Sequence, residues 1–273
     1  LRAAALAVLL VVALAPRPSI AADDDPGSGF LNPFPENDVY QVSVIGDWYS
    51  DGLLDGFVEV FGTDTRLNID RKVDRFLGVM RNKYPEDLAE LDRRVDTEPM
   101  NVAIVMFGQE DRVSLKNAAG RKVSVASPEW LAEYSKRIDR VMKALRRKNA
   151  AVYWVGMPNL ARGDANEQAQ KMNDVIRERA YLNGCKYIDV YAGFADEGGG
   201  YSAYGPDVEG KIRVLRGNDG VSFTRAGNLK LAHFVEKELR RDLNKARANR
   251  TVPLLGAEEE QAKINPENAF KTP

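Results

Sequence analysis

One apolar segment limits the fold of this chain more than any other feature. Residues 101–107 read Asn-Val-Ala-Ile-Val-Met-Phe, with no polar side chain after the first position. Such a run is typical of a strand buried on both faces of a parallel sheet. Residues 151–155 are also apolar, and residues 40–45 and 187–190 predict further strands, although they contain the polar residues Gln41, Ser43 and Asp189. The sequence therefore predicts a parallel sheet that contains this segment.

Helical patterns separate these strands. Apolar residues recur at helical spacing over residues 53–61. Ser127 followed by Pro128 predicts an N-cap and first turn, and Thr224 predicts the cap of a last helix that reaches about Leu243. A further helix is expected over residues 166–183. Strands that alternate with helices indicate a doubly wound α/β domain, in which ligands bind beyond the carboxyl ends of the strands.

The ends of the chain differ from this central part. Residues 1–22 predict a signal peptide, because an apolar run follows Arg2 and the small residues of a cleavage site come after it. Residues 23–38 are rich in proline and glycine and predict a flexible linker. The α/β domain is expected over residues 39–245, with a disordered tail over 246–273. An exported protein without disulfides fits the periplasm, or secretion, and no membrane attachment is expected after cleavage.

The composition argues against several classes of function. The 39 basic and 40 acidic side chains give a net charge of -1, so nothing favours nucleic-acid binding. The chain has one cysteine and one histidine, Cys185 and His233, which argues against a disulfide framework or a transition-metal site. No cofactor is expected.

Short blocks at the predicted strand ends resemble those of the SGNH (GDSL) hydrolases. Three blocks carry the resemblance in the right order: Gly46-Asp47-Trp48-Tyr49-Ser50, Gly108-Gln109-Glu110-Asp111 and Asp219-Gly220-Val221-Ser222. In the family they read Gly-Asp-Ser, Gly-x-Asn-Asp and Asp-x-x-His. Two longer stretches between the last two blocks, residues 153–158 and 205–213, resemble a periplasmic, alphaproteobacterial branch of unknown function. The resemblance implies a three-layer, flavodoxin-like sheet over residues 39 to 243.

The departures from these blocks concern the catalytic groups themselves. Trp48 stands where the family has its nucleophilic serine, and Ser222 stands where it has the catalytic histidine. Glu110 replaces an asparagine that stabilises the oxyanion, and its carboxylate would repel a developing negative charge. No glycine of the second block is recognisable at residues 69–75. Of the catalytic positions only the acidic Asp47 and Asp219 are retained, so we expect a protein without the covalent hydrolase mechanism.

Two rescues of the chemistry remain open. Ser50 is a candidate for a displaced nucleophile, although capping the following helix is its more ordinary role. Asp47, Glu110 and Asp219 would form an acid pocket if they converged, whereas Asp47 and Asp219 would be structural if they accepted hydrogen bonds from local backbone amides. His233 lies inside the last predicted helix and is expected to be structural.

The candidate ligand-binding residues are those of the three blocks: Asp47, Trp48, Tyr49, Gly108, Glu110, Asp219 and Ser222. The aromatic pair Trp48 and Tyr49 would stack on a sugar ring or fill the vacated catalytic space. Three functions follow. The first is a non-catalytic binding or scaffolding protein for an envelope carbohydrate, cell-wall polymer or protein partner. The second is a structural partner subunit, and the third an SGNH-type esterase, for example of O-acetylated envelope glycans, that works through displaced residues.

Overall fold

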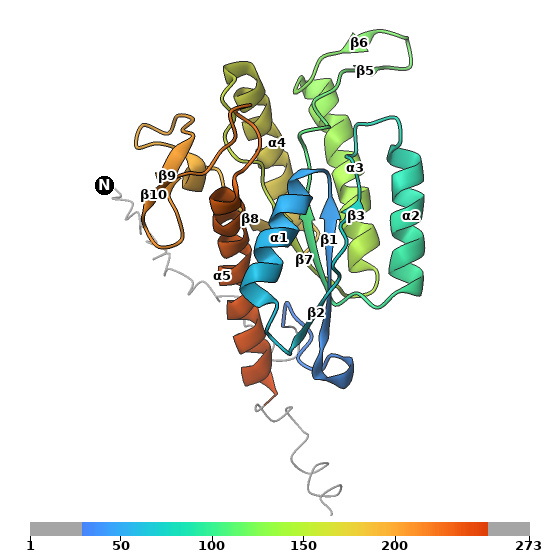
Figure 1. The fold of residues 1–273 in the computed structure, drawn as a ribbon. Helices are drawn as coiled ribbons and strands as arrows, with labels where there is room; N and C mark the ends of the chain where they lie inside the picture. Colours follow the sequence, from blue (N-terminus) through green and yellow to red (C-terminus); the bar gives the residue numbers. More distant parts are fainter. Residues whose placement is uncertain (1–28, 251–273) are drawn as a thin grey trace, which may run out of the picture.

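A parallel sheet forms the centre of the molecule, which we describe from a computed structural model that covers residues 29–250. Its strands are β1 (Tyr40–Gly46), β2 (Leu67–Ile69), β3 (Asp74–Arg75), β4 (Val102–Met106), β7 (Ala151–Val155) and β8 (Lys186–Ile188). They lie in the order β2-β1-β4-β7-β8, with β3 paired to the end of β1 beyond β2 (Figure 1). This is the flavodoxin-like doubly wound order. The predicted fold class is confirmed.

Helices cover both faces of this sheet and make three layers. Helices α1 (Tyr49–Phe61) and α5 (Arg225–Asn249) pack side by side on one face (Figure 1). The other face carries α2 (Tyr84–Thr97), α3 (Pro128–Arg146) and α4 (Gly163–Leu182). Successive side chains of β4 point to opposite faces, so Val102 and Ile104 belong to the first core while Ala103 and Val105 belong to the second. Double burial explains the unbroken apolar run in the sequence.

The two predicted helix caps are present. The Ser127 hydroxyl accepts a hydrogen bond from the Trp130 amide at 3.4 Å, and the Thr224 hydroxyl accepts one from the Gly227 amide at 3.2 Å. Each satisfies one of the free amides of a first helical turn.

Several helices, strands and turns were not predicted from the sequence. They are the helix α2, the strands β2 and β3, two hairpins, β5 (Leu115–Lys116) with β6 (Lys122–Val123) and β9 (Tyr204–Pro206) with β10 (Ile212–Val214), and the 3-10 turns η1 (Glu36–Asp38) and η2 (Ala192–Phe194). Helix α2 buries only Leu91 and Val95, so its apolar pattern is too thin to stand out from its many charged residues.

The ordered structure extends on both sides of the domain expected over residues 39–245. Leu31 is buried in the core, and the Tyr40 hydroxyl donates to the Asn32 carbonyl at 2.7 Å. Helix α5 continues to Asn249 with Ala246 buried. The segment predicted as a signal peptide lies outside the described residues. Between residues 29 and 250, no helix combines the length and apolar character that crossing a bilayer requires.

Candidate functional site

The predicted site lies between β1 and β4, where the strand order reverses. Gly46 and Met106 are paired at the ends of these strands, and Asp47 and Gly108 follow soon after. The fully buried Asp47 carboxylate accepts the Tyr49 amide at 3.0 Å and the Gly108 amide at 3.1 Å. It therefore fastens the loop after β1 to the loop after β4. Burial raises the pKa of Asp47 to about 7, because the backbone hydrogen bonds only partly offset the loss of solvation.

Aromatic rings fill the space beside Asp47. The Trp48 ring, at the position of the family nucleophile, stacks on Tyr49 with centroids 4.3 Å apart. Tyr49 is almost fully buried and lies against Phe223 at 5.8 Å. Burial raises the pKa of its phenol, and its hydroxyl has no hydrogen-bond partner among the described residues. Of the two alternatives for Trp48 and Tyr49, these contacts favour the one in which the rings fill the vacated catalytic space over the one in which they stack on a sugar ring in an open cleft.

The sequence suggested that Ser50 caps the helix that follows it, but in the structure it does not. Trp48 holds the N-cap position of α1, without a side-chain bond, and Ser50 lies in the first turn. Its buried hydroxyl donates to the Met106 carbonyl at 2.7 Å, with the Ile45 carbonyl at 3.3 Å. A Cβ on Gly46 would overlap both the Met106 carbonyl and the Ser50 hydroxyl, so glycine is required for this close approach of α1 to β4.

No histidine supports Ser50 as a nucleophile. His233, the only histidine in the chain, lies on the exposed side of α5 and contacts Glu236 at 3.0 Å. Ser50 instead donates its proton to backbone carbonyls, and those are not bases that activate a hydroxyl. In this geometry the Ser50 hydroxyl is a structural tie.

Ser222 occupies the position of the family histidine without its chemistry. Its amide and hydroxyl both donate to the same oxygen of Asp219, at 2.8 and 2.9 Å, and the Val221 amide donates there as well at 2.9 Å. Burial alone would raise the pKa of Asp219, but these hydrogen bonds outweigh it and lower the pKa below its ordinary value. The carboxylate is thus committed to its own loop.

The acidic side chains do not gather into a cation site. Glu110 forms an ion pair with Arg81 at 3.2 Å, and Asp219 is held by its local amides. Within the part of the chain that the structure describes, no group of three or more His, Cys, Asp or Glu is placed to hold a metal ion. Glu110 is still close enough to Asp47 to contribute to its raised pKa.

A glycine that the sequence did not single out, Gly78, lies in the loop three residues beyond β3. Gly78 packs against Asp111 so closely that a Cβ there would overlap the carboxyl group. Asp111 is fully buried, and its Oδ1 accepts the Met80 amide at 2.7 Å. Burial raises the pKa of Asp111 well above its ordinary value, and the nearby charge of Asp47 acts in the same direction. Gly78 thus lies directly beside the third block.

Comparison with known proteins identifies the family of the chain. Residues 41–238 match the family model described as protein of unknown function DUF459. The chain belongs to the DUF459 family. No curated protein matches it.

Solved structures show that the DUF459 chain shares the SGNH hydrolase fold. TesA matches with a TM-score of 0.52 at 12% identity, covering 74% of this chain and 99% of its own. A GDSL-like lipase from Bacteroides thetaiotaomicron matches with a TM-score of 0.53 at 13% identity, covering 77% and 92%. A carbohydrate esterase family 3 protein from Talaromyces cellulolyticus matches with a TM-score of 0.50 at 12% identity, covering 76% and 99%. At these identities the likeness concerns the fold alone.

A buried arginine supports the site of this DUF459 protein and was not singled out from its sequence. The Arg216 guanidinium is fully buried and donates to the carbonyls of Asn159 at 2.7 Å and Val221 at 2.7 Å, with a longer bond to Ser222 at 3.3 Å. It also lies over the Phe223 ring at 4.6 Å. No carboxylate of residues 29–250 forms an ion pair with it, and burial lowers its pKa. Arg216 therefore joins the loop after β7 to the loop of the last block.

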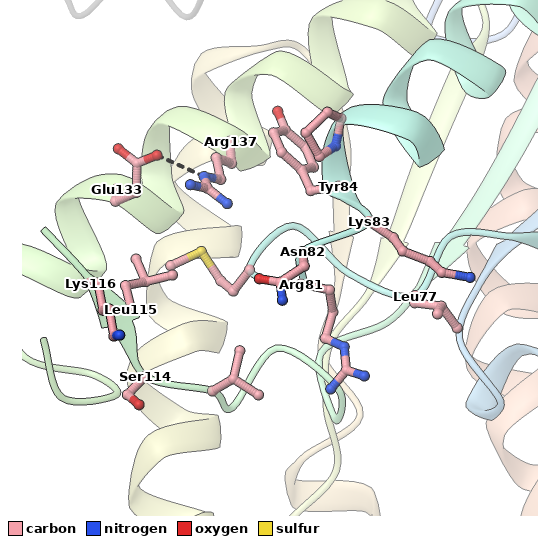
Figure 2. Close-up of a pocket in the computed structure, with 13 residues that line it drawn as sticks. Leu77, Arg81, Asn82, Lys83, Tyr84, Ser114, Leu115, Lys116, Glu133 and Arg137 are labelled. Carbon is pink, nitrogen blue, oxygen red and sulfur yellow. Dashed lines mark hydrogen bonds and ion pairs between the residues drawn. The ribbon is translucent and has the colours of Figure 1, made fainter. Parts of the chain in front are cut away.

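A cavity of about 1180 Å³ lies on the far side of Arg81 from Glu110, and none of the block residues described above lines it. Its walls come from the β3–α2 loop, the β5 segment and helix α3 (Figure 2). Arg81 faces the cavity and also pairs with Glu110, so it links the cavity to the loop after β4.

Proposed function

We propose that this DUF459 protein is a non-hydrolytic binding protein of the bacterial cell envelope, with an envelope glycan as its ligand. One observation carries the proposal. At the end of β1, where the family places its nucleophile, the chain has Trp48 stacked on the buried Tyr49, while the nearby Ser50 hydroxyl is bonded to backbone carbonyls. A covalent acyl transfer needs an accessible, activated nucleophile, and neither residue provides one.

Two further features support the proposal, one concerning the location of the protein and the other its binding of a ligand. The N-terminal sequence has the character of a signal peptide over residues 1–22, which favours the periplasm or secretion. The open cavity between the β3–α2 loop, β5 and helix α3 offers a place for a ligand without catalysis. The carbohydrate esterase among the structural neighbours makes a glycan a reasonable class to test first.

The purified mature chain is expected to hydrolyse p-nitrophenyl acetate and an acetylated xylo-oligosaccharide no faster than the buffer does. The Ser50→Ala variant is expected to give the same background rate, because Ser50 acts as a structural tie. A competent GDSL esterase assayed beside them shows that the conditions are suitable. Turnover by the wild type that disappears in Ser50→Ala would establish the esterase alternative and overturn the proposal.

A partner-subunit role is the second candidate, because the β9–β10 hairpin exposes apolar side chains. Tyr204 and Ile212 are 62% and 70% exposed, and Val214 lies on the same hairpin. Single exposed apolar residues are ordinary, but several on one hairpin are typical of a contact surface. A photo-crosslinking side chain at Ile212 in living cells is expected to give one discrete adduct, and none at the exposed Lys171 of α4 as control. Equal or absent labelling at both positions contradicts this role.

A further inference from the structure

The cavity between the β3–α2 loop, β5 and helix α3 has a basic lining in an almost neutral protein. Its charged wall residues are Arg81, Lys83, Lys116 and Arg137, against the single acid Glu133. Four positive charges and one negative give the cavity a net charge of +3, whereas the whole chain carries -1. A concave surface concentrates the field of such charges, so the cavity attracts anions.

The two arginines of the cavity are held in place by other groups. Arg137 donates to Glu133 at 2.7 Å and to the Val79 carbonyl at 2.8 Å, and its guanidinium lies 5.1 Å from the Tyr84 ring centroid. Arg81 is paired with Glu110 at 3.2 Å. Both therefore present positive charge from fixed positions, and part of that charge is already neutralised.

The two lysines are the cations left for a ligand. Neither Lys83 nor Lys116 forms an ion pair with any residue between 29 and 250. Figure 2 shows Lys116 on one side of the cavity and Lys83 on the other, with Asn82 and Arg81 between them. The cations are thus spread along the cavity. A single phosphate needs donors that converge on one point, whereas spaced cations fit a ligand with repeated negative charges.

The rest of the lining favours sugar rings over an acyl chain. Asn82 and Ser114 provide hydrogen-bonding groups, and they are set among apolar and aromatic surfaces from Leu77, Met80, Tyr84, Pro85, Val113 and Leu115. Sugar rings combine apolar faces with polar edges, whereas an acyl chain is best held by a continuous apolar tunnel. The volume of about 1180 Å³ exceeds the roughly 300–1,000 Å³ usual for small-molecule sites, so there is room for an oligomer.

We infer that this cavity binds a short acidic oligosaccharide, a glycan whose sugar units carry carboxylates, with Lys83 and Lys116 as the residues that contact those carboxylates. The inference rests on the proposed function as a binding protein and assigns its ligand class. It places the ligand on the α2–α3 side of the sheet, and no bond of the ligand is broken.

Isothermal titration calorimetry of the full mature chain with tetragalacturonate tests the inference. The wild type is expected to bind, with an affinity that falls as salt is added, and neutral maltotetraose is expected not to bind. The double variant Lys83→Gln, Lys116→Gln should lose about tenfold or more in affinity, because two charge-assisted contacts are removed. The matched control is Lys171→Gln, Lys211→Gln, which removes two exposed charges that are paired with Glu167 and Glu209 outside the cavity. It should bind like the wild type, and thermal melting should show all variants folded.

Three results would overturn the inference. The first is no binding of tetragalacturonate by the wild type, and the second is an equal loss in both double variants, which would indicate non-specific charge attraction. The third is tighter binding of tripolyphosphate than of tetragalacturonate, which would make the cavity an anion site without preference for sugars. The turnover assay with Ser50→Ala is independent of these results. An active esterase would therefore end the proposed non-hydrolytic role even if the cavity binds the acidic glycan.

Discussion

Replacing Arg216 by methionine is expected to destabilise the domain by about 3–5 kcal/mol. The guanidinium is the hydrogen-bond donor for the buried carbonyls of Asn159 and Val221. Methionine fills much of the same volume but leaves these acceptors unpaired, at roughly 1–3 kcal/mol each. Removing a buried charge recovers part of this loss. We expect the unpaired carbonyls to dominate, because besides Arg216 these two loops share only one long backbone bond at this point, from the Ala161 amide to the Gly220 carbonyl at 3.3 Å.

Urea unfolding followed by circular dichroism measures the effect as a lower midpoint at unchanged slope. Arg213→Met is the matched control, since Arg213 lies on the exposed hairpin and contacts Asp207 at 3.5 Å. Its expected change is within about 0.5 kcal/mol. Arg216→Lys should fall between wild type and Arg216→Met, because an ammonium keeps the charge but not the forked geometry. An unchanged midpoint for Arg216→Met contradicts the structural role given to this residue.

Much of the fold follows from local sequence. The run at residues 101–107 is apolar at every position after the first because β4 is buried on both faces, and this property is readable without knowledge of its neighbours. Ser127 and Thr224 mark their helix starts because an N-cap bond joins residues three apart. Once the strands are recognised, the positions of their ends are known as well. The sequence therefore predicts that Asp47 and Gly108 lie at one edge of the sheet.

The details of the site depend on contacts far apart in sequence. Ser50 was expected to cap a helix, yet its partner is the Met106 carbonyl, 56 residues away. Arg216 bonds to Asn159, 57 residues away, and no periodicity of the sequence marks either residue. Gly78 is informative only once Asp111 is seen against it. Loop residues of this kind acquire their roles from tertiary packing, which a single sequence does not show.

The stability of the wild type is expected to fall as the pH rises from about 4 to about 7, in part because of Asp47. Its pKa in the folded state is about 7, against an ordinary value of 3.8. Between these two values the folded protein holds a proton that the unfolded chain releases, so raising the pH favours unfolding. The contribution of Asp47 is present below pH 4 and lost above pH 7, and it amounts to at most about 4 kcal/mol. The buried Asp111 acts with the same sign.

The Asp47→Asn variant separates this effect from the rest. Asparagine cannot ionise, so its urea midpoint should change much less between pH 5 and pH 8 than that of the wild type. The asparagine oxygen can accept from only one of the Tyr49 and Gly108 backbone amides. Its side-chain NH₂ group then faces the other backbone N–H, which costs about 1–3 kcal/mol at every pH. The variant should therefore be less stable than the wild type at pH 5 and approach it at pH 8.

Asp219→Asn is the control for the pH measurement, because the pKa of Asp219 is lowered rather than raised. Its stabilising contribution is lost only as the pH falls through the acid range, so this variant should keep the wild-type slope between pH 5 and pH 8. If wild type and Asp47→Asn show the same slope in that interval, the Asp47 carboxyl is ionised in the folded protein at pH 5. The two backbone amides would then outweigh its burial, and Asp47 would add a negative charge to the filled site rather than a neutral tie between the loops after β1 and β4.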